Sequence, residues 1–133
     1  MLDIPIDSMT LYSLDASFTP GLDKPFKGET FYEYPALGKT DIASPDDRRE
    51  VLAAILKGIK ESNGERAFCF WPHHGVRLMQ NGKRIEYLIC YHCFQAYKFE
   101  DGKSTLQLTT RSPAKVLDAY LQKAGVPRQK DEE

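Results

Sequence analysis

The dipeptide Asn81-Gly82 is the feature that most constrains the fold of this chain. It lies between two runs rich in Val, Ile, Leu, Phe and Tyr, and that arrangement is typical of a type I′ turn joining two antiparallel strands. A two-residue turn also fixes which residues face each other across the hairpin. The expected pairs are Gln80 with Lys83, Leu78 with Ile85, and Val76 with Tyr87.

The far end of this hairpin holds histidine and cysteine residues. An unbroken ladder would place His73 opposite Cys90, although Pro72 and Gly75 favour a β-bulge there. The returning arm contains no glycine between residues 83 and 99, so it is predicted to be one continuous strand. Further strands are predicted at residues 9–14, within 30–42, at 67–71 and at 105–109.

Two helices are predicted, and each begins with a Ser-Pro pair. Ser44 and Ser112 are predicted to cap these helices, with Pro45 and Pro113 at their first positions. The apolar stripe of the first helix ends before Ser62-Asn63-Gly64, and that of the second ends at Gly125. Tight turns between the central strands favour antiparallel pairing. We therefore expect an α+β fold, in which a mainly antiparallel sheet of about four to six strands packs against two helices in two layers. Residues 1–126 are expected to form one domain, and residues 127–133 a charged, disordered tail.

The charge balance argues against a nucleic-acid partner. The chain has 18 Lys and Arg against 19 Asp and Glu, for a net charge of −1, and its basic residues are spread among acidic neighbours. The amino-terminal residues lack the charged and apolar regions of a signal peptide, and no later run is long enough to span a bilayer. We therefore expect a cytoplasmic protein that binds neither nucleic acid nor membrane.

Three cysteines and a histidine form the candidate metal site. Cys69, Cys90 and Cys93 with His73 or His74 supply three thiolates and one imidazole, a ligand set found in closed structural zinc sites. In a continuous strand, however, Cys90 and Cys93 would point to opposite faces and could not bind one ion without a bulge. The alternative is that the thiols are small buried apolar groups. A redox Cys-x-x-Cys pair is less favoured, because no helix follows it to stabilise a thiolate.

Phe31, Tyr32 and Tyr34 form a second candidate site. They lie in a segment with Pro35 directly after it, where large side chains are expected to stay partly exposed and to anchor a protein partner. The alternative is that this segment plugs one end of the core.

Two sequence blocks carry a resemblance. Cys69-Phe70-x-Pro72-x-His74-Gly75 and Ile89-Cys90-Tyr91-x-Cys93 resemble a family of small, uncharacterised bacterial proteins whose function is unknown. The family pattern commonly has arginine where this chain has His73. The resemblance implies that five positions act as one unit, with His74 rather than His73 beside the cysteines. That unit comprises Cys69, Pro72, His74, Cys90 and Cys93.

Three functions follow as hypotheses. The leading one is a non-enzymatic, protein-binding bacterial module of the inhibitor or immunity type, because the sequence has no Gly-x-Ser-x-Gly elbow, phosphate loop or helical His-Glu-x-x-His. The second is a metal- or thiol-dependent enzyme built on Cys69, His74, Cys90 and Cys93. The third is a structural zinc domain of a larger assembly.

Overall fold

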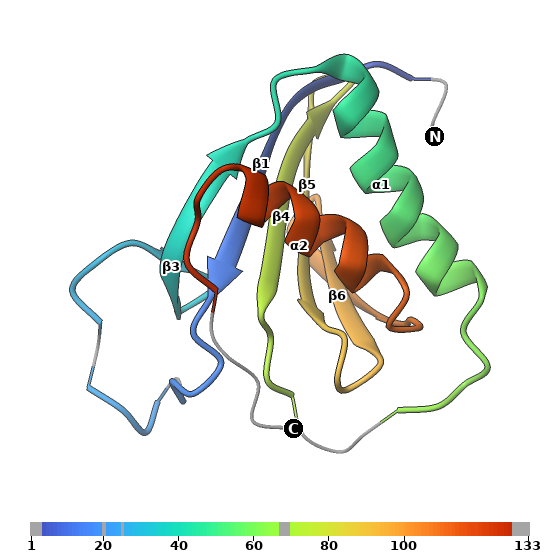
Figure 1. Cartoon of the computed structure of the whole chain (residues 1–133). Coiled ribbons are helices and arrows are strands. Elements are labelled where there is room, and N and C mark those ends of the chain that lie inside the picture. Colours follow the sequence, from blue (N-terminus) through green and yellow to red (C-terminus); the bar gives the residue numbers. More distant parts are fainter. Residues whose placement is uncertain (1–3, 20, 25, 67–69, 129–133) are drawn as a thin grey trace.

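The computed structural model describes residues 4–19, 21–24, 26–66 and 70–128, which form a curled seven-stranded sheet and two helices (Figure 1). The strands are β1 (Ile6–Leu14), β2 (Thr30–Phe31), β3 (Tyr34–Asp41), β4 (His74–Gln80), β5 (Lys83–Cys90), β6 (Gln95–Glu100) and β7 (Lys103–Leu108). Their order across the sheet is β2-β3-β1-β4-β5-β6-β7, and every neighbouring pair is antiparallel. The predicted α+β class is confirmed, and the described sheet has one strand more than the upper limit expected.

Both helices begin where the Ser-Pro pairs predict. In α1 (Pro45–Lys60) the side chain of Ser44 accepts a hydrogen bond from the Asp47 backbone N–H. In α2 (Pro113–Lys123) Ser112 makes no such cap, and its hydroxyl instead pairs with that of Thr110 at 2.9 Å. The capping role predicted for Ser112 is therefore wrong. No helix in the described part of the chain is both long and apolar enough to cross a membrane.

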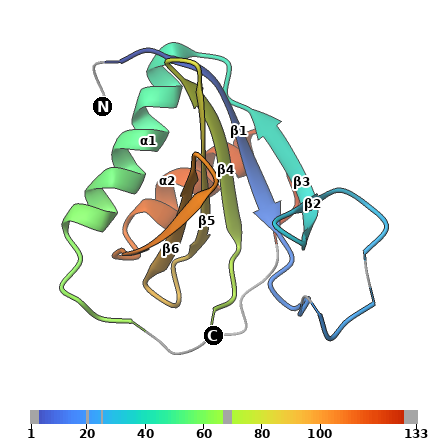
Figure 2. The same ribbon diagram turned by 180° about the vertical axis from the view of Figure 1, so that it is seen from behind.

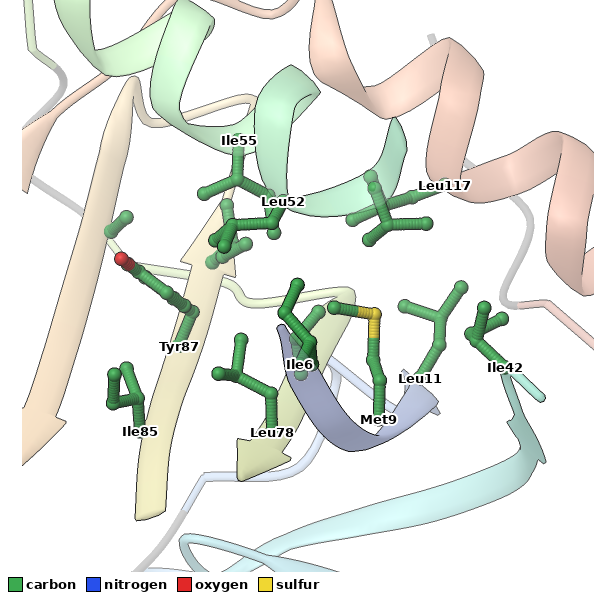
Figure 3. Close-up of a cluster of buried hydrophobic side chains, with 14 of the residues drawn as sticks. Ile6, Met9, Leu11, Ile42, Leu52, Ile55, Leu78, Ile85, Tyr87 and Leu117 are labelled. Carbon is green, nitrogen blue, oxygen red and sulfur yellow. The ribbon is translucent and has the colours of Figure 1, made fainter. Parts of the chain in front are cut away.

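The two helices pack on the same face of the sheet (Figures 1 and 2). Apolar side chains from β1, β4 and β5 meet the helices there and form the main core (Figure 3). Their burial removes apolar surface from water, which is the largest favourable term in folding. The fully buried members of this core include Leu11, Val51, Val76, Leu78, Tyr87, Ile89, Leu117 and Leu121.

The register predicted from Asn81-Gly82 is confirmed. Both turn residues have positive φ, and the β4–β5 ladder runs without interruption to the pair His74 with Ile89. The β-bulge expected at Gly75 is absent from this ladder. Gly75 is instead required for packing, because a Cβ at this position would lie 2.6 Å from Cδ2 of Phe31.

The returning arm is two strands rather than one. β5 ends at Cys90, a turn spans residues 91–94, and β6 runs back antiparallel. Phe94 allows this reversal without a glycine by adopting a left-handed backbone with φ 57°. The strand expected at residues 67–71 also differs, since Phe70 and Trp71 lie outside any strand and residues 67–69 are outside the described part.

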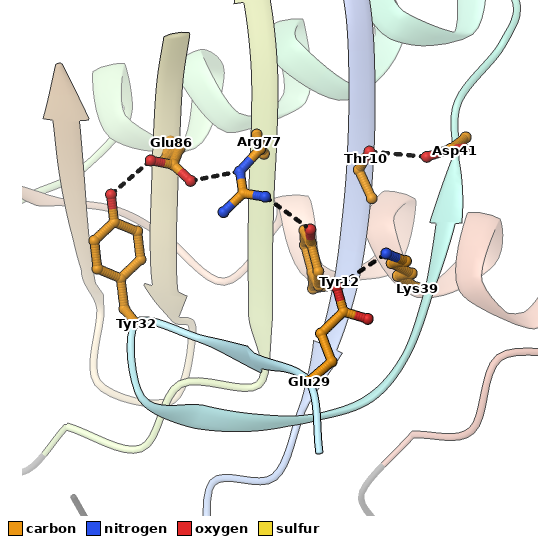
Figure 4. Close-up of polar contacts among 8 residues, drawn as sticks. All are labelled: Thr10, Tyr12, Glu29, Tyr32, Lys39, Asp41, Arg77 and Glu86. Atoms are coloured by element: carbon orange, nitrogen blue, oxygen red, sulfur yellow. Dashed lines mark hydrogen bonds and ion pairs between the residues drawn. The ribbon is translucent and has the colours of Figure 1, made fainter. Parts of the chain in front are cut away.

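The hairpin of β2 and β3 folds over the sheet face that is opposite the helices (Figure 4). It covers a second, smaller core made of Tyr12, Leu14, Phe31 and Leu88. Region 30–42, predicted to hold one strand, therefore contributes two strands joined by Tyr32 and Glu33. These two splits add two strands, and with Phe70 and Trp71 outside any strand the described sheet has seven strands instead of six.

Candidate functional site

The turn after β5 brings Cys90 and Cys93 together as a disulfide. The Cys93 backbone N–H donates to Sγ of Cys90 at 3.1 Å, and the Trp71 N–H donates to Sγ of Cys93 at 3.4 Å. Both cysteines are buried, whereas the Trp71 residue is 56% exposed. Cys69, the third predicted ligand, lies outside the described residues. A tight turn thus replaces the continuous strand that would have separated the two sulfurs.

His74 does not join these cysteines. It pairs with Ile89 on the helix-facing side of the sheet, so Cys90, the next residue along β5, faces the other side. Its Nε2 lies 2.7 Å from an Asp118 carboxylate oxygen on α2. Among the described residues, no three His, Cys, Asp or Glu side chains are arranged to hold a metal ion. The predicted zinc site of Cys69, His74, Cys90 and Cys93 stays a prediction, because Cys69 lies outside the described residues, and it would require the disulfide cysteines in their reduced form.

Asp118 has a second partner besides His74. Its second carboxylate oxygen lies 3.3 Å from the Arg128 guanidinium. Burial alone would raise the pKa of Asp118, but the hydrogen bond from His74 and the charges of His74, Arg128 and His73 outweigh it and lower the pKa. The sequence signal that could have found Asp118 is its place beside the buried Leu117 and Leu121 on α2.

Two buried polar atoms near this pair have no hydrogen-bond partner in the described structure, Nδ1 of His74 and the hydroxyl of Tyr91. The two rings meet edge to face, with centroids 5.5 Å apart. Burial raises the pKa of Tyr91, and the charge of Asp118 raises it further, so the phenol stays neutral. His74 therefore joins β4 to α2 through its polar contact with Asp118, and its ring packs against Tyr91, the residue that follows β5.

The three aromatic residues predicted to anchor a partner have different surroundings. Phe31 is buried, Tyr34 is partly buried, and Tyr32 is 38% exposed. The Tyr32 ring stacks on Phe99 with centroids 3.9 Å apart, and its hydroxyl donates to Glu86 at 2.6 Å. These contacts fit the alternative that this segment covers a core.

Glu86 also accepts a hydrogen bond from Nε of Arg77 at 2.7 Å, and Arg77 donates to the Tyr12 hydroxyl at 3.2 Å (Figure 4). Burial, followed by the hydrogen bond to Glu86 and the charge of that carboxylate, raises the pKa of Tyr32 to about 12. This network fixes the β2–β3 hairpin to the sheet.

The strand β7 presents an open edge that sequence reasoning did not single out. The turn Asp101-Gly102 begins it, and beyond its other end the Thr109 N–H donates to the Phe94 carbonyl at 3.0 Å. In an antiparallel ladder, hydrogen-bonded pairs alternate with pairs that are not hydrogen-bonded. The Asp101-Gly102 turn and the bond from Thr109 to Phe94 therefore fix which β7 residues hydrogen-bond to β6. Those residues are Lys103, Thr105 and Gln107. The backbone groups of Ser104, Leu106 and Leu108 therefore point away from the sheet.

These outward groups have no backbone hydrogen bond to any other described residue. The side chains of Leu106 and Leu108 are half-buried and lie on the face opposite the helices, where Leu106 is paired with Tyr97. On the helix side, a shallow depression of 380 Å³ runs along the β6–β7 hairpin. Its lining residues are Lys98, Glu100, Asp101, Lys103, Thr105 and Gln107.

Edge strands are usually protected from pairing by proline, a bulge, charge or short length. β7 has a regular register over six residues, contains no proline, and carries one charged residue, Lys103, at its start. The opposite edge of the sheet is different, because it ends in the two-residue strand β2, which pairs with Pro35. The two edges of the described sheet are therefore unequally protected.

Comparisons with protein-family models, with curated proteins and with solved structures find no match to this chain. The resemblance to small bacterial proteins therefore stays a prediction.

Proposed function

We propose that this protein is a non-enzymatic protein-binding module that takes up an extended segment of a partner polypeptide as an additional strand beside β7. The observation that carries the proposal is the row of outward backbone N–H and C=O groups at Ser104, Leu106 and Leu108. A partner strand would satisfy these groups through main-chain hydrogen bonds, which is a recurrent mode of peptide recognition. An inhibitor or immunity-type role is one use of such a contact.

The two faces of β7 define what the partner segment looks like. Its residues on one face would contact Leu106 and Leu108, so apolar side chains are favoured there. Its residues on the other face would lie beside Thr105 and Gln107 at the polar depression, where polar side chains are favoured. Because side chains alternate along a strand, the preferred segment alternates apolar and polar residues.

The disulfide turn gives less support to a thiol-dependent enzyme. Cys90 and Cys93 are both buried, and an attacking thiolate needs access to its substrate. The exposed Trp71 beside them is a side chain of the type that anchors protein contacts, which favours the same general class of function.

A displayed library of random peptides, selected against the full chain, tests the proposal. We expect selected peptides to alternate apolar and polar residues and to slow amide hydrogen exchange at Leu106 and Leu108. Leu106→Pro removes one outward N–H at a position where an edge strand tolerates proline. It should weaken peptide binding on the order of tenfold, the effect of losing one hydrogen bond.

Leu106→Val is the matched control, because it keeps the N–H and an apolar side chain, and it should bind peptides nearly as well as the wild type. Urea unfolding of both variants verifies that the sheet is intact. Selected peptides that bind Leu106→Pro with unchanged affinity, and protect amides elsewhere, would contradict strand addition at β7.

A further inference from the structure

We infer that one occupant of the β7 edge is a second copy of this chain, so that the two sheets join into one through antiparallel β7–β7 pairing. This inference rests on the proposed function, since it names a partner for the same edge. The register that satisfies the outward groups has its two-fold axis at Leu106. Leu106 then faces Leu106 of the second copy, and Ser104 faces Leu108 of the second copy.

The backbone chemistry is self-complementary in this register. Residues with outward backbone groups face each other in all three pairs, so each pair can exchange two N–H···O bonds. Thr105 lies opposite Gln107 of the second copy, which joins two uncharged polar side chains. No proline or bulge interrupts the row on either copy.

Opposite charges lie near the two ends of the strand. Asp101 precedes β7 and Arg111 follows it, so antiparallel pairing brings Asp101 of each copy toward the end of the joined strands where Arg111 of the second copy lies. The Asp101 side chain is 66% exposed, and the nearest lysine ammonium, that of Lys83, is 3.8 Å away. Arg111 is exposed and lies over the Phe94 ring. Lys103, the one charged residue within β7, would lie opposite Thr109.

The faces of the joined sheet also match. Leu106 and Leu108 of both copies would meet on the face opposite the helices, next to Tyr97, and cover apolar surface that each copy alone leaves half exposed. On the helix side, the depression along β6 and β7 shows that the residues beside this edge are not covered.

Sedimentation equilibrium of the full chain over a range of concentrations tests the inference. We expect a monomer–dimer equilibrium and concentration-dependent protection of the Leu106 amide from hydrogen exchange. Leu106→Lys places two ammonium groups opposite each other at the axis and removes the apolar contact, so the dimer Kd should rise on the order of tenfold or more.

Gln107→Lys is the matched control. It adds the same charge one residue away, but this residue faces Thr105 of the second copy rather than itself, so Kd should change less than about threefold. A charge exchange gives a second test. Asp101→Arg should weaken the dimer by opposing Arg111, and adding Arg111→Asp should restore it.

The outcomes separate this inference from the proposed function. A wild-type chain that stays monomeric while selected peptides still bind at β7 would overturn self-pairing and leave strand addition standing. A dimer whose Kd is unchanged by Leu106→Lys would also overturn the β7–β7 interface. A chain that neither dimerises nor binds peptides at β7 would overturn both.

Discussion

Nε2 of His74 lies 2.7 Å from the carboxylate of Asp118, and this contact joins the central strand β4 to helix α2 across 44 residues of sequence. His74 is buried, whereas the Asp118 side chain is 34% exposed. The contact fixes where α2 crosses the sheet. It also makes the position of this helix sensitive to the protonation of one carboxylate.

Asp118→Asn should lower the free energy of unfolding at neutral pH. It should also make that free energy change less as the pH falls into the acidic range. The pKa of Asp118 is lowered in the folded protein, so its contribution is present above the ordinary value of 3.8 and is lost as pH falls through the folded pKa. We expect a loss of about 1 kcal/mol at pH 7, at the low end for hydrogen bonds to charged groups because the carboxylate is partly solvated. Urea unfolding at a series of acidic pH values measures this loss. Asp7→Asn, at an exposed position on β1, is the control and should leave the fall in stability at acidic pH as it is in the wild type.

Arg77→Ala should destabilise the protein more than the double variant Arg77→Ala/Glu86→Gln. Glu86 is buried, so removal of Arg77 leaves its charge without this partner. We expect the single change to cost about 2 kcal/mol, less than for a fully buried pair because the Arg77 side chain is 41% exposed. Denaturant unfolding of both single variants and the double variant forms a complete cycle. Strictly additive losses would show that the two residues are not coupled.

Glu33→Gly and Tyr32→Gly should change stability in opposite directions. Both residues have left-handed backbone, with φ 74° at Glu33 and 48° at Tyr32, which costs a non-glycine residue about 1 kcal/mol. Glycine relieves that cost at Glu33, and its freedom in the unfolded chain offsets part of the gain, leaving about 0.5 kcal/mol. At Tyr32 the lost stacking on Phe99 and the lost hydrogen bond to Glu86 outweigh the relief, for a net loss of about 2 kcal/mol. If thermal unfolding shows that both variants lose the same stability, this prediction is wrong.

Gly75→Ala should destabilise the sheet face that is opposite the helices. The new methyl group would lie 2.6 Å from the Phe31 ring, and Phe31 is 1% exposed, so the ring has little room to move. Overpacking of this kind costs about 1–3 kcal/mol. The second-site change Phe31→Leu should recover part of the loss in the Gly75→Ala background while costing stability on its own. If Phe31→Leu gives no recovery, the clash lies elsewhere.

Local turn chemistry explains which parts of the fold were predictable. Asn81-Gly82 adopts left-handed backbone at little cost, so its register could be predicted from two residues. The turns at Tyr32-Glu33 and at Phe94 place large side chains in the same backbone region. Nothing local favours that choice, because the contacts that offset it, such as Tyr32 with Phe99, come from distant strands. The sequence therefore indicated too few strands.

Prediction of the candidate sites was limited in the same way, because their residues are brought together by contacts between distant parts of the chain. The proximity of Cys90 and Cys93 requires the turn at residues 91–94, which the sequence did not predict. The face of His74 requires the β4–β5 register to continue past Gly75 without the expected bulge. The pairing of His74 with Asp118 depends on where α2 crosses the sheet, which no spacing encodes. The open edge at β7 needed the full strand order, because an edge is a property of the whole sheet.

The place of β1 in that order has a consequence for how the chain folds. β1 pairs on one side with β3 and on the other with β4, which follows only after α1. Strands β4 to β7, in contrast, form a meander of consecutive hairpins whose contacts are local and close quickly. During synthesis β1 therefore emerges before its partner strands but completes its pairing late, once β4 is available. Until then its apolar residues, Leu11 among them, lack their final cover, and this is the interval in which the chain is most exposed to aggregation.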